Sequence, residues 1–167
     1  NATHGSTTDP DARLAKKGSG KEAKLSYQAS VLIENRHGLV VLTAVDPADG
    51  PAVEVAQAEQ LLQAWATVRP ASAGPATIGA DRGYDQAGFV EAARALGFTP
   101  HVAQVTHRRS AIDGRTHRHP GYGLSQDRRK RIEQTFGWGK TVGLLRKLRH
   151  RGRALVDWIF TFTMAAY

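Results

Sequence analysis

A strand–helix–strand pattern over residues 76–105 constrains the fold of this chain more than any other feature. Residues 76–80 form a short apolar run, residues 89–96 place apolar side chains at helical spacing, and residues 99–105 have the composition of a second strand. Two strands that are joined through one helix pair in parallel with a right-handed crossover. The pattern therefore predicts a parallel pair of strands covered by a helix.

The preceding segment has the pattern of an antiparallel hairpin. Residues 25–34 alternate between apolar and polar side chains, residues 35–38 are a turn of hairpin length, and residues 39–45 are rich in β-forming side chains. An amphipathic helix is predicted over residues 52–68. The hairpin and the parallel strands together predict an α/β fold with a mixed sheet that is flanked by helices.

The length of 167 residues fits one domain, which we place over residues 1–167. Residues 1–24 are rich in turn-forming and charged side chains and are predicted to be an exposed loop. The chain begins at Asn1 and ends at Tyr167 within an apolar pattern. We therefore expect it to be a piece of a longer protein.

The composition excludes several classes of protein. The chain has no cysteine, which excludes disulfides and thiolate metal sites and fits a reducing cytoplasm. The long apolar run at residues 154–167 has 14 residues, too few to span a bilayer. We predict instead a core helix that buries Leu155, Trp158, Ile159 and Phe162.

Positive charge is concentrated in one part of the sequence. The net charge is +8, yet residues 101–153 hold 14 Lys and Arg against three acidic residues, a net charge of +11, and the remainder has a net charge of −3. The asymmetry predicts a polyanionic partner, with nucleic acid favoured over lipid because no lipid anchor is visible. A basic loop at residues 106–124 and a cationic run at residues 146–153 suit phosphate contacts. The alternative is a basic surface that serves solubility only.

Two aspartates follow the predicted strand 76–80. Asp81 lies at the C-terminal tip of this strand, where α/β proteins often place catalytic side chains because the strand fixes the residue and the loop opens to solvent. Asp85 precedes the next helical pattern and is predicted to cap that helix. This assignment would leave Asp81 free for catalysis. The alternative is that Asp81 forms the cap or an Asx turn itself.

The segment 126–140 is predicted to be one helix with a charged face. At about 100° per residue, Arg129, Glu133 and Lys140 point in the same direction. A carboxylate is then held on a rigid helix between two cations, which suits a metal-binding acid that meets DNA phosphate. The alternative is an ordinary surface ion pair between Arg129 and Glu133.

The motif Ala80-Asp81-Arg82-Gly83-Tyr84-Asp85 and the segment 129–140 occur in an order and spacing that resembles bacterial insertion-sequence transposases of the DDE type. The most similar group has a tyrosine–arginine–glutamate–lysine signature around its catalytic glutamate. Residues 6–14, 34–41, 109–115 and 145–152 resemble the same group, so the resemblance covers nearly the whole chain.

The resemblance implies a ribonuclease-H-like fold in which three acids bind two divalent ions, Mg²⁺ or Mn²⁺. Asp81 matches the second acid and a metal ligand, and Glu133 matches the third. Arg129 and Lys140 match the arginine and lysine of the signature, whereas its tyrosine falls on Gln126.

The first aspartate of the family lies on a first strand, which here would precede Asn1. Asp9 and Asp11 match it poorly because they lie in a turn beside Pro10. The resemblance therefore implies the C-terminal part of a catalytic domain that lacks the first strand, and a fragment that alone is inactive or nearly so.

The implied function is that of a bacterial DNA transposase that cleaves transposon ends and joins them to target DNA. The implied protein is cytoplasmic and nucleoid-associated, a dimer at full length, with no membrane partner and no small-molecule cofactor. The residues expected to contact DNA are Arg108, Arg109, Arg115, Arg118, Arg128, Arg146, Lys147, Arg149, Arg151 and Arg153. The alternatives are a decayed nucleic-acid-binding remnant and a hydrolytic nuclease of the same fold.

Overall fold

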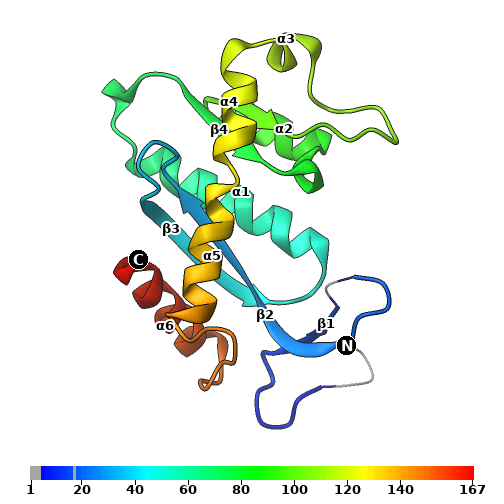
Figure 1. The fold of residues 1–167 in the computed structure, drawn as a ribbon, viewed down its shortest axis with the longest axis vertical. Helices are drawn as coiled ribbons and strands as arrows, with labels where there is room; N and C mark the ends of the chain where they lie inside the picture. The colour runs from blue at the N-terminus through cyan, green and yellow to red at the C-terminus, as the bar shows by residue number, and fades with distance from the viewer. Residues whose placement is uncertain (1–4, 17) are drawn as a thin grey trace.

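Two β-sheets organise the fold, which is shown as a ribbon in Figure 1. The structure is a computed structural model that describes residues 5–16 and 18–167. One sheet is antiparallel, with strands β1 (Arg13–Ala15), β2 (Lys24–Ile33) and β3 (Val40–Pro47) in that order. The other is the parallel pair β4 (Ala76–Ala80) and β5 (Phe98–Val102). The predicted hairpin and parallel pair are confirmed, although β5 ends earlier than predicted and β1 lies in the predicted N-terminal loop.

The helices lie around these sheets. They are α1 (Pro51–Val68), α2 (Ala87–Ala95), α3 (Gly114–His117), α4 (Pro120–Arg128), α5 (Arg131–Thr141) and α6 (Arg153–Ala166), with short 3-10 turns at Ala71–Ala73 and Arg82–Tyr84. In Figure 1, β4 and α2 to α4 lie toward one end of the long axis, whereas β2, β3, α5 and α6 lie toward the other. The prediction of a loop over residues 106–124 is wrong in part, because α3 and the first half of α4 fall within it.

One face of the hairpin packs on α5 and α6. Val31 and Val45 of the hairpin form a buried cluster with Val156, Phe160 and Met164 of α6. Ile132 and Phe136 of α5 pack against the same cluster. This cluster is one of the two hydrophobic cores.

The opposite face of the hairpin packs on α1 through a polar contact. The Ser30 hydroxyl donates to Gln57 Oε1 over 2.6 Å, and Gln57 Nε2 donates to Asp46 Oδ2 over 2.8 Å. Gln57 is 1% exposed, so these bonds satisfy an amide that burial would otherwise leave unpaired. The second hydrophobic core lies beyond α1, where Leu62 meets Phe89 of α2 and Val102 of β5.

The predicted buried face of the C-terminal helix is wrong. Leu155, Trp158 and Phe162 are 46%, 59% and 63% exposed, and Ile159 is half-buried. The buried residues of α6 are Val156, Phe160 and Met164. Because α6 is apolar on most of its circumference, the 3.6-residue period fits both faces.

Two glycines lie close to α6. A methyl group at Gly139 would lie 2.7 Å from Met164 Cε, the flexible end of that side chain, and one at Gly143 would lie 2.4 Å from Thr163 Cγ2 and 2.8 Å from Gly139 O. A side chain at Gly143 would therefore displace the backbone after α5 or its neighbour on α6. A methyl group at Gly137 would meet open space.

The predicted helix over residues 126–140 is interrupted. The bonds from Ile132 N to Arg129 O (3.2 Å) and from Glu133 N to Lys130 O (3.0 Å) span three residues, which tightens the backbone between α4 and α5. Past this point, Arg131 Nη1 donates to the carbonyls of the hairpin turn at Asn35 and Arg36, over 2.9 Å each. Helix α4 packs on β4 and β5, whereas α5 packs on the hairpin, so the helix bends where its contacts change.

The N-terminal segment supplies the hydrogen bonds that α6 lacks at its own start. Asp9 Oδ1 accepts from Gly152 N over 3.1 Å and from the Tyr27 hydroxyl over 2.6 Å, and Asp11 Oδ2 accepts from Arg153 N over 2.8 Å. Burial alone would raise the pKa of Asp9, but these hydrogen bonds outweigh it and hold the pKa below its usual value. The two carboxylates thus cap a helix that is far away in sequence.

Replacing Asp9 by alanine should lower the free energy of unfolding by about 1–2 kcal/mol at pH 7, because the cap and the tyrosine bond are lost. A depressed pKa means that the Asp9 contribution is present above the unfolded pKa of about 3.9 and is lost as the pH falls through the folded pKa. Urea unfolding of Asp9→Ala and wild type between pH 7 and pH 3 should therefore converge. Asp127→Ala, at an exposed position, serves as control, and a difference that does not shrink with acid would contradict the assignment.

Candidate active site

A cavity of about 350 Å³ lies where β4 ends, beside the start of α1 and the end of α4. Its lining includes two carboxylates, Glu54 and Asp81, and two cations, Arg82 and Arg129. Tyr84 also lines the cavity, and its hydroxyl bonds to Glu54. The predicted acid Asp81 and the predicted cation Arg129 therefore share one cavity, although they are far apart in sequence.

Asp81 is exposed and caps the 3-10 turn Arg82–Tyr84. Its Oδ1 accepts from Gly83 N over 2.8 Å, while Oδ2 has no hydrogen-bond partner among the described residues. The local turn thus uses one oxygen and leaves the other directed to solvent or to a ligand. Asp81 therefore forms the cap or Asx turn that was the alternative prediction, and it does so through Oδ1 alone.

Asp85 does not cap the following helix, so that prediction is wrong. It is fully buried, and its two oxygens accept from Val105 N over 2.8 Å and from Ala111 N over 2.7 Å. Burial would raise the pKa of Asp85, but these backbone bonds and the Ser110 hydroxyl lower it below the usual value. Asp85 therefore anchors the loop after β5, and α2 begins at Gln86 without a side-chain cap.

Glu54 and Tyr84 line the cavity, although neither was predicted from the sequence to be a site residue. The Tyr84 hydroxyl donates to Glu54 Oε1 over 2.9 Å. Burial, followed by the negative charges of Glu54 and Asp81, raises the pKa of Tyr84, so the phenol stays protonated and remains a donor. An acid in the first turn of a helix, as Glu54 is in α1, was the available signal, but it is equally typical of an ordinary helix start.

Helix α4 is fastened above the carboxyl end of β5 by three side chains. The Tyr122 hydroxyl donates to Val102 O over 2.7 Å, and Ser125 Oγ lies 2.7 Å from His101 Nδ1. Gln126 Nε2 donates to His101 O over 2.6 Å. Gly79 of β4 lies directly beneath this helix, since a methyl group there would be in van der Waals contact with Ser125 O at 3.4 Å. This docking brings Arg129 to the cavity.

Arg129 is held by Gln126 and not by Glu133. Its Nε donates to Gln126 Oε1 over 3.0 Å, and no ion pair joins Arg129 to Glu133 in the described part of the chain. The predicted alternative of an ordinary surface ion pair is therefore wrong. Gln126, whose role the sequence left open, supports the arginine of the signature.

The family model described as the transposase DDE domain matches residues 2–167. The chain belongs to the transposase DDE-domain family. No curated protein matches it, and no solved structure matches it.

Membership explains the architecture. The antiparallel sheet and the parallel pair, flanked by helices, fit the ribonuclease-H-like fold of a DDE domain. A DNA substrate follows from the family in general terms. None of the described helices combines the length and apolar character needed to cross a bilayer.

The two remaining signature residues lie along α5. Glu133 is exposed in the first turn of α5 and is not part of the cavity lining. Lys140 lies near the other end of α5, with Nζ 5.8 Å from the centre of the Phe136 ring, and it lines a separate, more apolar cavity. Asp81 and Arg129 therefore share one cavity, whereas Glu133 and Lys140 lie on α5, outside that cavity.

DDE transposases use divalent metal ions, and the donors at this cavity fit such an ion in kind. Carboxylate oxygens come from Asp81 and Glu54, and Oδ2 of Asp81 has no other partner. Among residues 5–16 and 18–167, however, no group of three His, Cys, Asp or Glu side chains is close enough to hold a metal. The donor atoms suit a divalent ion, but two carboxylates are too few to hold it, so a further ligand is needed.

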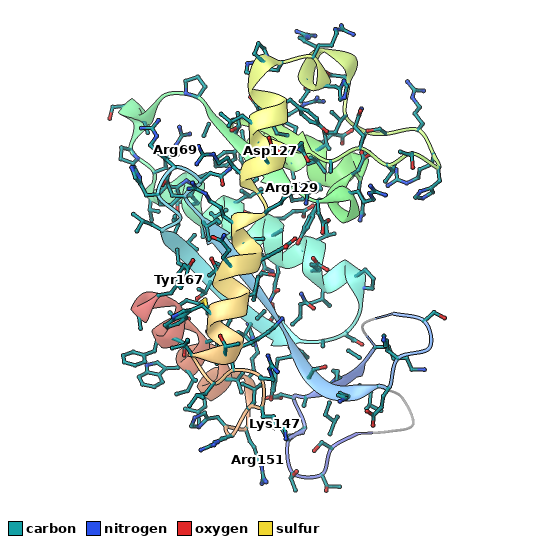
Figure 2. All side chains as sticks on the ribbon, in the orientation of Figure 1. Arg69, Asp127, Arg129, Lys147, Arg151 and Tyr167 are labelled. Atoms are coloured by element: carbon teal, nitrogen blue, oxygen red, sulfur yellow. The ribbon has the colours of Figure 1, made fainter. Side chains whose placement is uncertain are left out.

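Most of the arginines predicted to contact DNA are exposed, but two have structural partners. Arg153 forms an ion pair of 2.9 Å with Asp46 and donates to Val45 O over 2.9 Å. Arg108 donates to the backbone carbonyl of Asp85. Figure 2 shows Arg129 at the junction of α4 and α5, whereas Lys147 and Arg151 lie near the opposite end of the molecule from α3.

Replacing Asp85 or Asp81 by alanine should separate a structural aspartate from an available one. Asp85→Ala leaves two buried N–H groups unpaired and should lower the free energy of unfolding by about 2–4 kcal/mol. Asp81→Ala should cost less than about 1 kcal/mol, because Gly83 N can turn to water. Urea unfolding at pH 7 measures both, and equal losses would contradict the distinction.

Proposed function

We propose that this chain forms part of the catalytic domain of a DNA transposase that cleaves transposon-end DNA and joins the freed end to target DNA. The observation that supports this most is the shared cavity of Asp81 and Arg129 at the end of β4, in a chain of the transposase DDE-domain family. A carboxylate next to a guanidinium suits a site that must hold a metal ion against a phosphate group.

Asp81 and Glu133 are the proposed metal ligands. A pair of divalent ions, Mg²⁺ or Mn²⁺, would activate the attacking hydroxyl and stabilise the leaving oxygen at the scissile phosphate. Oδ2 of Asp81 would be available to such an ion, because it has no hydrogen-bond partner among the described residues, whereas Oδ1 accepts from Gly83 N. Glu133 is exposed and has no ion-pair partner among the described residues, which leaves its carboxylate available for the same task.

A further ligand is proposed to come from an additional strand. The edge of β2 from Tyr27 to Ile33, opposite β3, has no strand partner in the described chain, and β4 pairs with β5 alone. Open strand edges of this kind accept another strand through backbone hydrogen bonds. A strand that carries the first aspartate of the family would raise the number of carboxylates near Asp81.

The proposed binding surface for DNA follows the two consecutive helices α4 and α5 (residues 120–141). In Figure 1, α3, which holds Arg115, lies at the α4 end of these helices, and Figure 2 shows Arg151 toward the α5 end. Arg118 closely precedes α4, and Arg149 lies two residues before Arg151. Arg129, in the cavity with Asp81, would contact the DNA backbone near the site of cleavage, and Lys140, near the other end of α5, would contact it further along. Phosphate contacts of this type position DNA without reading its sequence. A dimer and association with the nucleoid are part of the same proposal.

The second candidate is a nucleic-acid-binding protein without catalysis. It is favoured by the absence of a three-residue metal group in the described part of the chain. Such a protein would bind DNA with a steep salt dependence and would not cleave it at any metal concentration.

The decisive experiment uses a longer form of the protein that includes an aspartate-bearing strand before Asn1. In that form, Asp81→Ala or Glu133→Ala should reduce Mg²⁺-dependent cleavage of transposon-end DNA to background while retaining most of the binding, because metal ligands are lost and cations remain. Glu91→Ala, an exposed acid on α2, is the matched control. Cleavage that survives either change removes that residue from the mechanism. The 167-residue chain alone should be inactive or nearly so.

Neutralising Arg149 and Arg151 together should weaken binding to duplex DNA uniformly across sequences. The slope of log affinity against log salt should fall by about 0.9 for each phosphate contact that is lost. Fluorescence anisotropy over a salt series measures both quantities. Lys16→Ala with Lys21→Ala, at exposed positions in the other half of the chain, should leave the slope unchanged. An equal change in both pairs would indicate nonspecific attraction by net charge alone.

A further inference from the structure

Gln126 makes two hydrogen bonds that use opposite ends of its amide. Nε2 donates to His101 O of β5 over 2.6 Å, and Oε1 accepts from Arg129 Nε over 3.0 Å. Because a carbonyl can only accept and Nε–H can only donate, the two partners fix the orientation of the amide. The side chain thus connects the edge of the candidate site to the parallel sheet.

The bond to Gln126 leaves the terminal nitrogens of Arg129 available. Among the described residues, Nε is the one guanidinium atom of Arg129 with a hydrogen bond, and Arg129 is part of the cavity lining. A guanidinium that is held by Nε keeps Nη1 and Nη2 for a second, bidentate contact with a phosphate. The fixed side chain also loses less rotamer entropy when it binds.

We infer that Gln126 is a positioning residue that holds the Arg129 guanidinium so that its two terminal nitrogens face the cavity beside Asp81 and take the phosphodiester of DNA. The phosphate part of this inference rests on the proposed function. The positioning part rests on the two hydrogen bonds alone. A tyrosine, the residue of the signature, would have to make both contacts through its one hydroxyl oxygen, whereas the amide divides them between Nε2 and Oε1.

Two substitutions of Gln126 and one control test its two hydrogen bonds. Gln126→Met keeps the length of the side chain and removes both bonds. Gln126→Glu keeps an acceptor for Arg129 Nε, loses the donor to His101 O and places a negative charge beside the guanidinium. Gln134→Met, at an exposed glutamine of α5 whose side chain has no hydrogen bond among the described residues, is the matched control.

The first measurement needs no DNA. The ¹⁵Nε–Hε signal of Arg129 is identified by its absence in Arg129→Lys, and its exchange with solvent is measured by NMR. Exchange should be about tenfold faster in Gln126→Met, and it should stay slow in Gln126→Glu and in Gln134→Met. Equal exchange in wild type and Gln126→Met would overturn the inference, whether or not the protein binds DNA.

The second measurement is a double-mutant cycle on affinity for duplex DNA. Gln126→Met should weaken binding about three- to tenfold in wild type and have no further effect in Arg129→Met, because it acts through that side chain. Gln126→Glu should lower the salt slope by about one, since its charge neutralises Arg129. A purely structural role predicts the same loss in both backgrounds and would overturn the inference. If Arg129→Met itself leaves affinity unchanged, the phosphate role in the proposed function fails, while the exchange measurement still decides the positioning.

Discussion

The docking of α4 on the end of β5 is the constraint on which the candidate site depends. Tyr122, Ser125 and Gln126 each bond to the last residues of β5, and all three groups on the strand are buried or half-buried. Burial, with a smaller contribution from His119, lowers the pKa of His101, so the imidazole stays neutral beneath the helix. Hydrogen bonds in such a buried place are stronger than at the surface and are costly to break singly. They fix both the height and the rotation of α4 above the sheet.

The bend after Arg129 follows from a second set of contacts. Arg131 bonds to the two carbonyls of the hairpin turn, and α5 packs into the core between the hairpin and α6. Helix α4 is thus attached to the parallel pair, and helix α5 is attached to the antiparallel sheet. Arg129 lies where these attachments meet, so its position depends on both sheets. Glu133, one turn later, lies on α5, whose position is set by its contacts with the hairpin.

Local patterns predicted the elements well and the side-chain roles poorly. The hairpin, α1 and β4 were predictable, because alternation, helical period and Pro–Gly boundaries are local signals. The role of Asp85 was not, since its partners Val105 and Ala111 lie in a loop that the chain reaches only after β5. The buried face of α6 was missed because most of this helix is apolar and its partners Val31 and Val45 lie in the distant hairpin. Asp81 and Arg129 were predicted from their places in a strand–loop and a helix pattern and by resemblance, whereas Glu54 and the role of Gln126 became visible only through the three-dimensional contacts.

The charges around the site explain why the proposed function requires a cation. Residues 101–153 would attract DNA through a net charge of +11, yet Glu54, Asp81 and Glu133 place negative charge along the same path. Carboxylates without a cationic partner repel phosphate and so weaken the binding that the arginines provide. Arg129 offsets part of this repulsion, but the bond from its Nε to the neutral Gln126 leaves its charge free for the phosphate and not for an acid. A divalent ion between carboxylate and phosphate would convert the repulsion into attraction, so the charge distribution supports the metal requirement of the proposed function.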